Sequence, residues 1–181
     1  MKHLATMTLM LNLAIASVYA QDRPVKMTFS GTGGPSAIDL KQASANTGEE
    51  NVVGDGTLGS FTFRNVSATG LSPQPSSACS GIFFPRIAGA GVLRFQDGSL
   101  LAVSLMQGGD CIDLVQMVGN CSLTLKITGG TGRFKSASGV LTYTEMARPV
   151  LADAMNNPVF FSEVGEITGT ISGVPMDQDS Q

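Results

Sequence analysis

The stretch Ile-Thr-Gly-Gly-Thr-Gly-Arg-Phe-Lys-Ser-Ala-Ser-Gly, residues 127–139, decides how this chain folds. Its glycines are as dense as those of a phosphate-binding loop, but their spacing does not fit one. A Walker loop has glycine before its Lys-Ser pair, where Phe134 stands here, and Lys135 occupies the last glycine of the TGxxGxxG dinucleotide pattern. The following residues, 139–144, are typical of a strand, so no helix N-terminus is available to bind phosphate. The sequence therefore predicts no nucleotide cofactor.

The same stretch fits a tight turn between two strands. Gly129, Gly130 and Gly132 are predicted to adopt positive φ angles in a sharp, crowded turn. Phe134 is predicted to fold back as an apolar plug at one end of the fold. Gly139 allows close backbone approach where the next strand begins. These five residues have a structural role in this interpretation.

Short apolar or β-branched runs, separated by glycine, asparagine or aspartate, recur along the chain. They predict about eight strands, over residues 27–30, 57–66, 91–95, 100–106, 112–117, 121–128, 139–145 and 160–171. Asp97-Gly98 lies between two of these runs and predicts a hairpin with positive φ at both residues. Gly119-Asn120 predicts a second hairpin. This spacing is typical of a single all-β barrel or sandwich.

The remaining segments are expected to be irregular or short. Residues 30–51 and 71–80 are predicted to be long loops, and residues 150–155 are the best helix candidate, one or two turns long. Several strands are apolar on both faces. We therefore expect the long loops, or a second copy of the chain, to cover part of the outer surface.

Residues 127–144, ITGGTGRFKSASGVLTYT, resemble the GGTGxFxxAxG turn of the allene oxide cyclase and dirigent barrel superfamily, especially its small secreted bacterial members. The similarity spans about residues 54–173 and includes Asp97-Gly98-Ser99 and the final EITGTISG. The resemblance implies a single antiparallel barrel of eight strands with a central apolar cavity, often trimeric in the plant members.

Two activities are associated with that superfamily. Its plant cyclases fold a fatty-acid epoxide around a cavity carboxylate and a bound water, and its dirigent proteins orient phenoxy radicals. No cavity residue of either kind is matched in this sequence, and the cysteines and the loop over residues 30–51 depart from both. The resemblance therefore carries over the fold alone.

The N-terminus has the pattern of a signal peptide. An apolar run over residues 4–15 is followed by Val18 and Ala20 at the two positions that a signal peptidase reads. The run is too short to cross a bilayer, which needs about 20 residues. We expect a secreted or periplasmic protein. Its expected organisation is a signal peptide over residues 1–20, a β-barrel domain over 21–174 and a frayed tail over 175–181.

The composition excludes several classes of function. Without Lys2, 10 basic residues face 14 acidic ones, a net charge of −4, so we expect no nucleic-acid partner and no membrane association after signal cleavage. The only histidine is His3, in the predicted signal peptide. The mature chain therefore contains no Ser-His-Asp triad, no Cys-His pair and no histidine-ligated metal, and we expect neither a cofactor nor a metal.

Three cysteines remain, Cys79, Cys111 and Cys121. In an oxidising compartment two of them are expected to pair. If Gly119-Asn120 is a two-residue turn, Cys111 lies a full strand, more than about 20 Å, from Cys121. A Cys79–Cys111 disulfide at one barrel end, with Cys121 free at the other, is then expected. An irregular loop before Cys121 would instead allow Cys111 and Cys121 to pair.

Two carboxylates are candidate catalytic residues. Glu145 shares a strand face with Tyr143, and Glu163 shares a face with Ile167 on the last predicted strand. If these strands pair, both carboxylates lie near the same barrel end beside apolar walls, where their pKa values would diverge as acid–base chemistry requires. In the alternative interpretation they are rim residues in water, or partners of Arg148 or Arg94.

Two function classes follow. The first is a non-catalytic secreted barrel that binds a small apolar ligand or serves as a structural module, with self-association into a homo-oligomer as a further option. The second is a cyclase- or isomerase-like enzyme that acts on a small apolar substrate through a cavity carboxylate. An apolar cavity with a few polar groups is more generally a binding site. A cavity lined by apolar side chains with an inward glutamate would favour the enzyme, and a barrel filled by side chains would favour the structural module.

Overall fold

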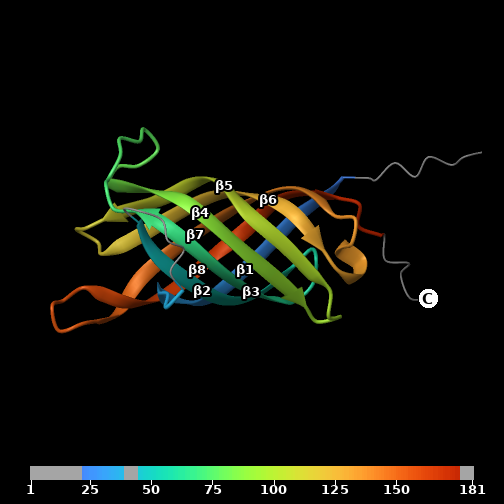
Figure 1. Cartoon of the computed structure of the whole chain (residues 1–181), viewed down its shortest axis with the longest axis horizontal. Coiled ribbons are helices and arrows are strands. Elements are labelled where there is room, and N and C mark those ends of the chain that lie inside the picture. Colours follow the sequence, from blue (N-terminus) through green and yellow to red (C-terminus); the bar gives the residue numbers. More distant parts are fainter. Residues whose placement is uncertain (1–21, 39–44, 176–181) are drawn as a thin grey trace, which may run out of the picture.

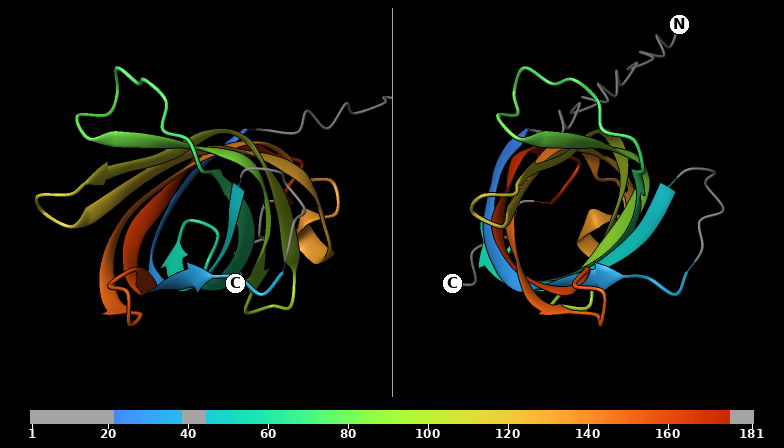
Figure 2. Two further views of the ribbon diagram at one scale, coloured as in Figure 1. Left: turned by 60° about the vertical axis from the view of Figure 1, so that its left-hand side comes forward. Right: turned by 90° about the vertical axis from the view of Figure 1, so that its left-hand side faces the viewer.

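The computed structural model describes residues 22–38 and 45–175, which form a closed, eight-stranded antiparallel β-barrel (Figures 1 and 2). Each strand pairs with the next, and β1 pairs with β8 to close the ring. The all-β barrel predicted from the sequence is confirmed. The predicted signal peptide and most of the predicted tail lie outside the described residues. The elements are β1 (Arg23–Pro35), β2 (Ala45–Gly56), β3 (Phe61–Gly70), β4 (Ile82–Phe95), β5 (Leu100–Asp113), β6 (Val118–Gly130), η1 (Gly132–Phe134), β7 (Ser138–Ala152) and β8 (Pro158–Ser172).

The strand register places the connections between strands at two opposite ends of the barrel. Residues 57–60, 96–99 and 131–137 connect strands at one end, at the right of Figure 1. Residues 71–81, 114–117 and 153–157 connect strands at the other end. The first end is plugged by side chains, and we call it the plugged end. The second contains a cavity, and we call it the open end.

The glycine-rich stretch forms the plug. Phe134 in η1 is 0% exposed, and its ring lies 4.7 Å from the ring of Phe95. The Arg133 guanidinium covers both rings, 4.6 Å from the centroid of Phe134 and 5.0 Å from that of Phe95. Gly132 has φ +57°, a conformation that favours glycine. The predicted apolar plug is therefore confirmed.

The other glycines of the stretch differ in detail. Gly129 and Gly139 also have positive φ, but Gly130 does not, contrary to the expectation. Gly130 is needed for space instead, since a Cβ there would lie 2.6 Å from the Leu100 carbonyl oxygen and 2.7 Å from the Cβ of Phe134. Close approach is also required at Gly139, where a Cβ would collide with the Thr170 carbonyl.

A filled apolar core occupies the barrel between the plug and the open end. Inward side chains from all eight strands pack there, and the largest are fully buried. They include Met27, Phe63, Leu93, Leu101, Leu141, Tyr143, Ile167 and Ile171. Phe29 stacks on Tyr143 at 4.8 Å, which places the phenol ring at the boundary between this core and the open end.

Three predictions about secondary structure were wrong. Residues 30–51, predicted to be a loop, contain the end of β1 and the first half of β2. Residues 112–117 are not a separate strand, because 112–113 end β5 and 114–117 form a turn. Residues 150–155 are not helical. They end β7 and enter a turn in which the Asp153 carboxylate accepts hydrogen bonds from the backbone N–H groups of Met155 and Asn157.

The hairpin predictions had mixed outcomes. The hairpin at Asp97-Gly98 is confirmed, but only Gly98 has positive φ. Asp97 instead accepts a hydrogen bond from the Ser99 N–H, at 2.9 Å. Gly119-Asn120 is not a turn, since both residues lie inside β6. The turn lies at residues 114–117, where Met117 has φ +52°.

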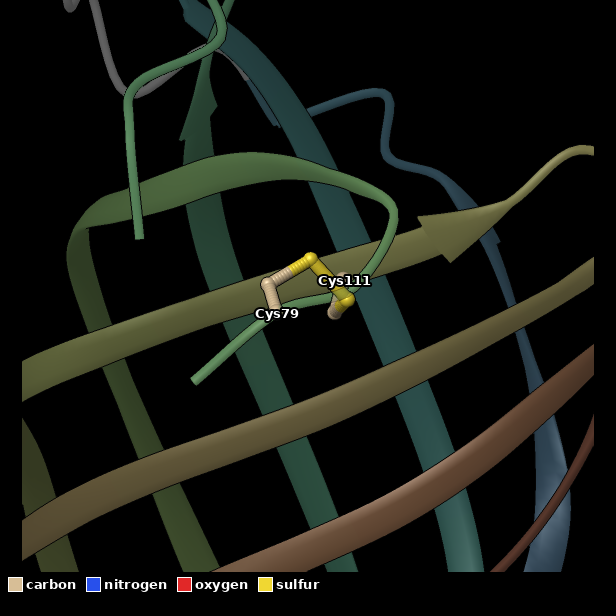
Figure 3. The surroundings of a disulfide bond; sticks show 2 residues. All are labelled: Cys79 and Cys111. Atoms are coloured by element: carbon tan, nitrogen blue, oxygen red, sulfur yellow. A yellow bond between two sulfur atoms is a disulfide. The ribbon is translucent and has the colours of Figure 1, made fainter. Parts of the chain in front are cut away.

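The disulfide joins Cys79 to Cys111, as expected, with a Cα–Cα distance of 5.5 Å (Figure 3). The reason differs from the predicted one. Cys111 lies opposite Asn120, so it is close to Cys121 along the sheet but points to the opposite face. Cys121 is free and buried inside the barrel beside Asp110, and not at the other end as predicted. The disulfide ties the loop over residues 71–81 to the outside of β5.

This disulfide should contribute strongly to stability. It closes a loop between cysteines 32 residues apart, for which the chain-entropy relation gives about 3–4 kcal/mol. We expect the double variant Cys79→Ser/Cys111→Ser to lose that amount in urea unfolding, and a reducing agent to have no further effect on it. Peptide mapping without reduction should give a Cys79–Cys111 linked peptide, whereas a Cys111–Cys121 peptide would contradict the fold.

Candidate functional site

The open end of the barrel contains a cavity of about 970 Å³. Its walls carry large apolar side chains, many of them exposed around the mouth. They include Ile38, Leu71, Leu114, Met117, Val159 and Phe161. Its floor is polar and is formed by Glu50, Ser67, Arg86, Asp110, Cys121, Glu145 and Glu163. An apolar chamber with a few convergent polar groups is the usual form of a small-molecule site.

The structure brings Glu145 and Glu163 together on this floor. Glu145 on β7 lies opposite Gly165 of β8, and Glu163 lies opposite Ala147, so the two glutamates are diagonal neighbours on the inner face. Glu145 is 6% exposed and Glu163 is 4% exposed. The alternative interpretation as solvated rim residues is therefore wrong. Among the ion pairs of the described residues, none joins either glutamate to an arginine.

Glu50 is a third carboxylate that the sequence reasoning missed. It lies on β2 and is buried, and one oxygen of each of Glu50, Glu145 and Glu163 lies within 4.8 Å of the others. The side-chain amide of Asn65, directly opposite on β3, donates to Glu50 Oε2 at 2.7 Å. The three strands β2, β7 and β8 thus bring three buried carboxyl groups to one point.

Arg86 provides the positive charge on the floor. Its Nη1 lies 2.7 Å from Glu50 Oε1, and its Nε and Nη2 make a bidentate pair with Asp110 at 2.9 and 3.0 Å. Arg86 also donates to the Ser67 hydroxyl. Four of its five N–H donors are therefore engaged, two with Asp110 and one each with Glu50 and Ser67. Burial alone would lower the pKa of Arg86, but the charges of Glu50 and Asp110 outweigh it and hold the pKa well above its usual value.

Two irregularities in the sheet turn Arg86 and Asp110 inward. The register shifts between β3 and β4 at Ala68/Thr69, and between β5 and β6 at Leu105/Gln107. Such bulges reverse the alternation of a strand from that point onward. As a result Arg86 is inside while its neighbour Ile87 is exposed. The two partners of the ion pair share the inner face because both strands carry a bulge.

Tyr143 connects Glu145 to Glu50. Its hydroxyl is hydrogen-bonded to Glu145 Oε2 and lies 3.2 Å from Glu50 Oε2. A phenol has a single proton, so it donates to one carboxyl group and accepts from the other. Glu50 is paired with Arg86 and suits the ionised role, which leaves Glu145 as the protonated donor. The hydrogen bonds therefore run from Glu145 through Tyr143 to Glu50.

Burial and the neighbouring charges favour a protonated Glu145, and they outweigh the hydrogen bond with Tyr143, which lowers the pKa of Glu145. Burial, and then the charge of Glu50, raises the pKa of Glu145 to about 8. Burial, and then the charges of Glu145 and Glu50, raises the pKa of Glu163 to about 9. Both groups hold a proton at neutral pH. Burial also raises the pKa of the Cys121 thiol well above its usual value, so this thiol is not a nucleophile.

Glu163 is the free acid of the site. Its Oε2 atom is buried and has no hydrogen-bond partner among the described residues. Gly33 on β1 makes the room for this side chain, because a Cβ at Gly33 would overlap the Glu163 carboxyl group. A buried carboxyl oxygen without a partner costs free energy, and a ligand that supplies the missing bond removes that cost.

The donor set is less suited to a metal ion. Glu50, Glu145 and Glu163 are oxygen ligands of the kind that divalent cations prefer. However, Arg86, Asn65 and Tyr143 already bind the oxygens of Glu50. The arrangement is better suited to hydrogen bonding and proton exchange with a bound molecule.

Sequence similarity gives no independent assignment. No protein-family model matches this chain, and no curated protein is significantly similar to it. The cavity and its floor are therefore the basis for a functional assignment.

The raised pKa values predict how stability depends on pH. The folded state holds protons on Glu145 and Glu163 that the unfolded chain releases near pH 4.5, so their contribution is complete below that pH. It is lost as the pH rises through about 8 to 9. We expect the urea midpoint to fall between pH 5 and pH 9.

A matched pair of variants tests the source of that pH dependence. Glu163→Gln should reduce the fall in stability, because the amide cannot ionise. Glu166→Gln changes an exposed residue on the same strand and should leave the fall unchanged. A urea midpoint that is equal at the two pH values in the unmodified protein would contradict the predicted protonation.

Proposed function

We propose that this protein binds a small molecule with an apolar body in the cavity at the open end of the barrel. The observation that carries the proposal is the combination of an apolar-walled cavity of about 970 Å³ with a buried, unpartnered carboxyl oxygen of Glu163 on its floor. The walls would enclose the apolar body, and the floor would fix the polar end. Ligand binding without catalysis requires no further functional group in the site.

A fluorescence experiment tests this function. N-phenyl-1-naphthylamine, a neutral apolar probe, should bind with a rise in emission. Ala147→Trp should abolish the rise, because Ala147 lines the cavity and the larger ring would fill it. Met146→Trp is the matched control, since Met146 is its neighbour on β7 but is exposed on the outer surface. No binding by the unmodified protein, or equal binding by both variants, would contradict the proposal.

A second candidate is a cyclase- or isomerase-like enzyme. The chain Glu145–Tyr143–Glu50 favours it, since an acid with a pKa of about 8 is suited to exchange a proton with a substrate near neutral pH. Such an enzyme should exchange the α-protons of a small cyclic ketone in D₂O, as measured by mass spectrometry. Glu145→Gln should stop the exchange without preventing probe binding. A rate equal to that of the buffer alone would rule out this activity for ketones.

We also propose that the chain is exported and that it belongs to the allene oxide cyclase and dirigent superfamily. The disulfide is compatible with an oxidising compartment. Among the described residues, no helix has the length and apolar character needed to cross a bilayer. The eight-stranded barrel and its cavity agree with what the resemblance of residues 127–144 implies. Intact mass spectrometry of the exported protein should give a chain that begins at Gln21.

A further inference from the structure

The charges on the cavity floor do not balance among the described residues. Carboxyl groups come from β2, β5, β7 and β8, while β4 supplies one guanidinium. The carboxyl groups are those of Glu50, Asp110, Glu145 and Glu163. The donors of Arg86 go to Glu50, Asp110 and Ser67. The other two groups that face the floor, the Tyr143 hydroxyl and the Cys121 thiol, are neutral. Among the described residues, no ion pair joins Glu145 or Glu163 to a cation, although the charge of Arg86 lowers the pKa of both.

The distances leave room for a cation between Glu145 and Glu163. One carboxyl oxygen of Glu145 and one of Glu163 lie within 4.8 Å of each other, and Glu163 Oε2 is buried with no partner among the described residues. A nitrogen bonded to both oxygens would lie about 2.8 Å from each, a span of up to about 5.6 Å. An ammonium nitrogen between the two groups therefore satisfies both. It carries three donors, so it can also supply the bond that Glu163 Oε2 lacks.

Resting on the proposed function, we infer that the ligand of this cavity is a primary amine with an apolar body, whose ammonium group binds between Glu145 and Glu163. The apolar walls contact the rest of the molecule. A carboxylate or phosphate ligand would meet an excess of negative charge. A bare divalent cation prefers six or more oxygen ligands, and among the described floor residues only Glu145 and Glu163 have carboxyl groups that are not held by Arg86.

Protonation supports the same ligand class and adds a measurable consequence. At neutral pH the empty site holds protons on Glu145 and Glu163. An ammonium ion favours the ionised form of both groups, so its binding releases protons to the solvent. A neutral ligand such as an alcohol leaves the protons in place. Proton release on binding therefore distinguishes an amine held by two carboxylates from an amine held only by its apolar part.

Calorimetry with three matched probes tests the inference. The probes are 3-phenylpropylamine, 3-phenylpropan-1-ol and 3-phenylpropanoate, which share one apolar body and differ in the polar end. At pH 7.5 we expect the amine to bind at least about tenfold more tightly than the alcohol, which corresponds to about 1.4 kcal/mol, and the carboxylate to bind most weakly. Repeating the titration in buffers of different ionisation enthalpy should show the release of between about one and two protons per amine.

Variants assign the effect to the floor. Glu163→Gln should weaken binding of the amine at least about tenfold and change the affinity for the alcohol by no more than about twofold. The amide keeps the shape of the carboxyl group but not its charge. Glu166→Gln, on the outer surface of the same strand, should change neither. Thermal unfolding of each variant checks that it is folded. Ala147→Trp should weaken the binding of all three probes, because the larger ring fills the cavity.

The possible results separate the two proposals. If the alcohol binds as tightly as the amine, or if no proton is released, the amine inference is wrong and the proposed binding function stands. If Glu163→Gln leaves the amine unaffected, the ammonium does not bind where we place it. If none of the three probes binds, both proposals are contradicted. Saturable binding of calcium or zinc without binding of the amine would also overturn the inference.

Discussion

Replacing Arg86 with methionine is expected to destabilise the protein by about 3–5 kcal/mol. The arginine is the cation between Glu50 and Asp110, at 2.7 and 2.9 Å, and the methionine side chain fills its volume without a charge. Glu50 would then be buried, and Asp110 half-buried, without a counter-charge, which costs more than the ion pair itself contributes. Urea unfolding at pH 7 measures the loss.

Two controls distinguish this effect from a general loss of packing. Arg94→Met changes an exposed arginine on the same strand and should alter stability by less than about 0.5 kcal/mol. The triple variant Arg86→Met/Glu50→Gln/Asp110→Asn removes the unpaired charges and should recover part of the loss. A single Arg86→Met variant as stable as the unmodified protein would show that the floor is not organised around this guanidinium.

Replacing Phe134 with alanine should also cost about 3–5 kcal/mol, through lost apolar burial and the cavity left behind. Its ring is fully buried against Phe95 under the Arg133 guanidinium, so the plugged end would lose the contact that closes it. Thermal or urea unfolding at pH 7 measures the change. Phe160→Ala removes a ring that is 38% exposed on β8 and should cost much less. A near-neutral result for Phe134→Ala would mean that the ring is not a plug.

The plugged half of the barrel was predictable because its inner face is apolar. On β7 and β8 the alternation of Leu141, Tyr143 and Ile167 marks the inner face without ambiguity. Glu145 and Glu163 continue that alternation, so their meeting at one barrel end could be inferred from the sequence. The glycine-rich turn was predictable for the same reason, since it has to return the chain across a closed apolar core.

The open half was poorly predicted because its inner face is polar. β2 was missed since its inward residues include Glu50 and Gly48, which give no apolar alternation. The one usable signal was that Glu50 and Val52 are two residues apart and therefore point to the same face of a strand. Arg86 was missed for a second reason, because the bulges in β4 and β5 reverse the alternation and place it inside against the parity of Leu93. A functional floor built from charges removes the pattern that reveals strands.

The register between the strands could not be predicted from the sequence either. The choice of Gly119-Asn120 as a turn was reasonable from residue preferences alone, but the Asp113 carboxylate accepts hydrogen bonds from the N–H groups of Val115 and Gln116 and forms the turn earlier. The correct disulfide was therefore obtained from an incorrect register. What excludes Cys121 is the face on which it lies, and that is fixed only once the pairing of β5 with β6 is known.

Carbon NMR of the glutamate carboxyl groups measures directly whether the cavity floor holds two protonated glutamates at neutral pH. The sequence contains five glutamates, so each signal can be assigned by substitution. We predict that two signals titrate well above the ordinary range, with apparent midpoints near 8 and 9 that belong to the pair, and that Glu145→Gln and Glu163→Gln each remove one of them. If all five signals titrate between about pH 4 and 5, the ordinary range for glutamate, the account of the site is contradicted.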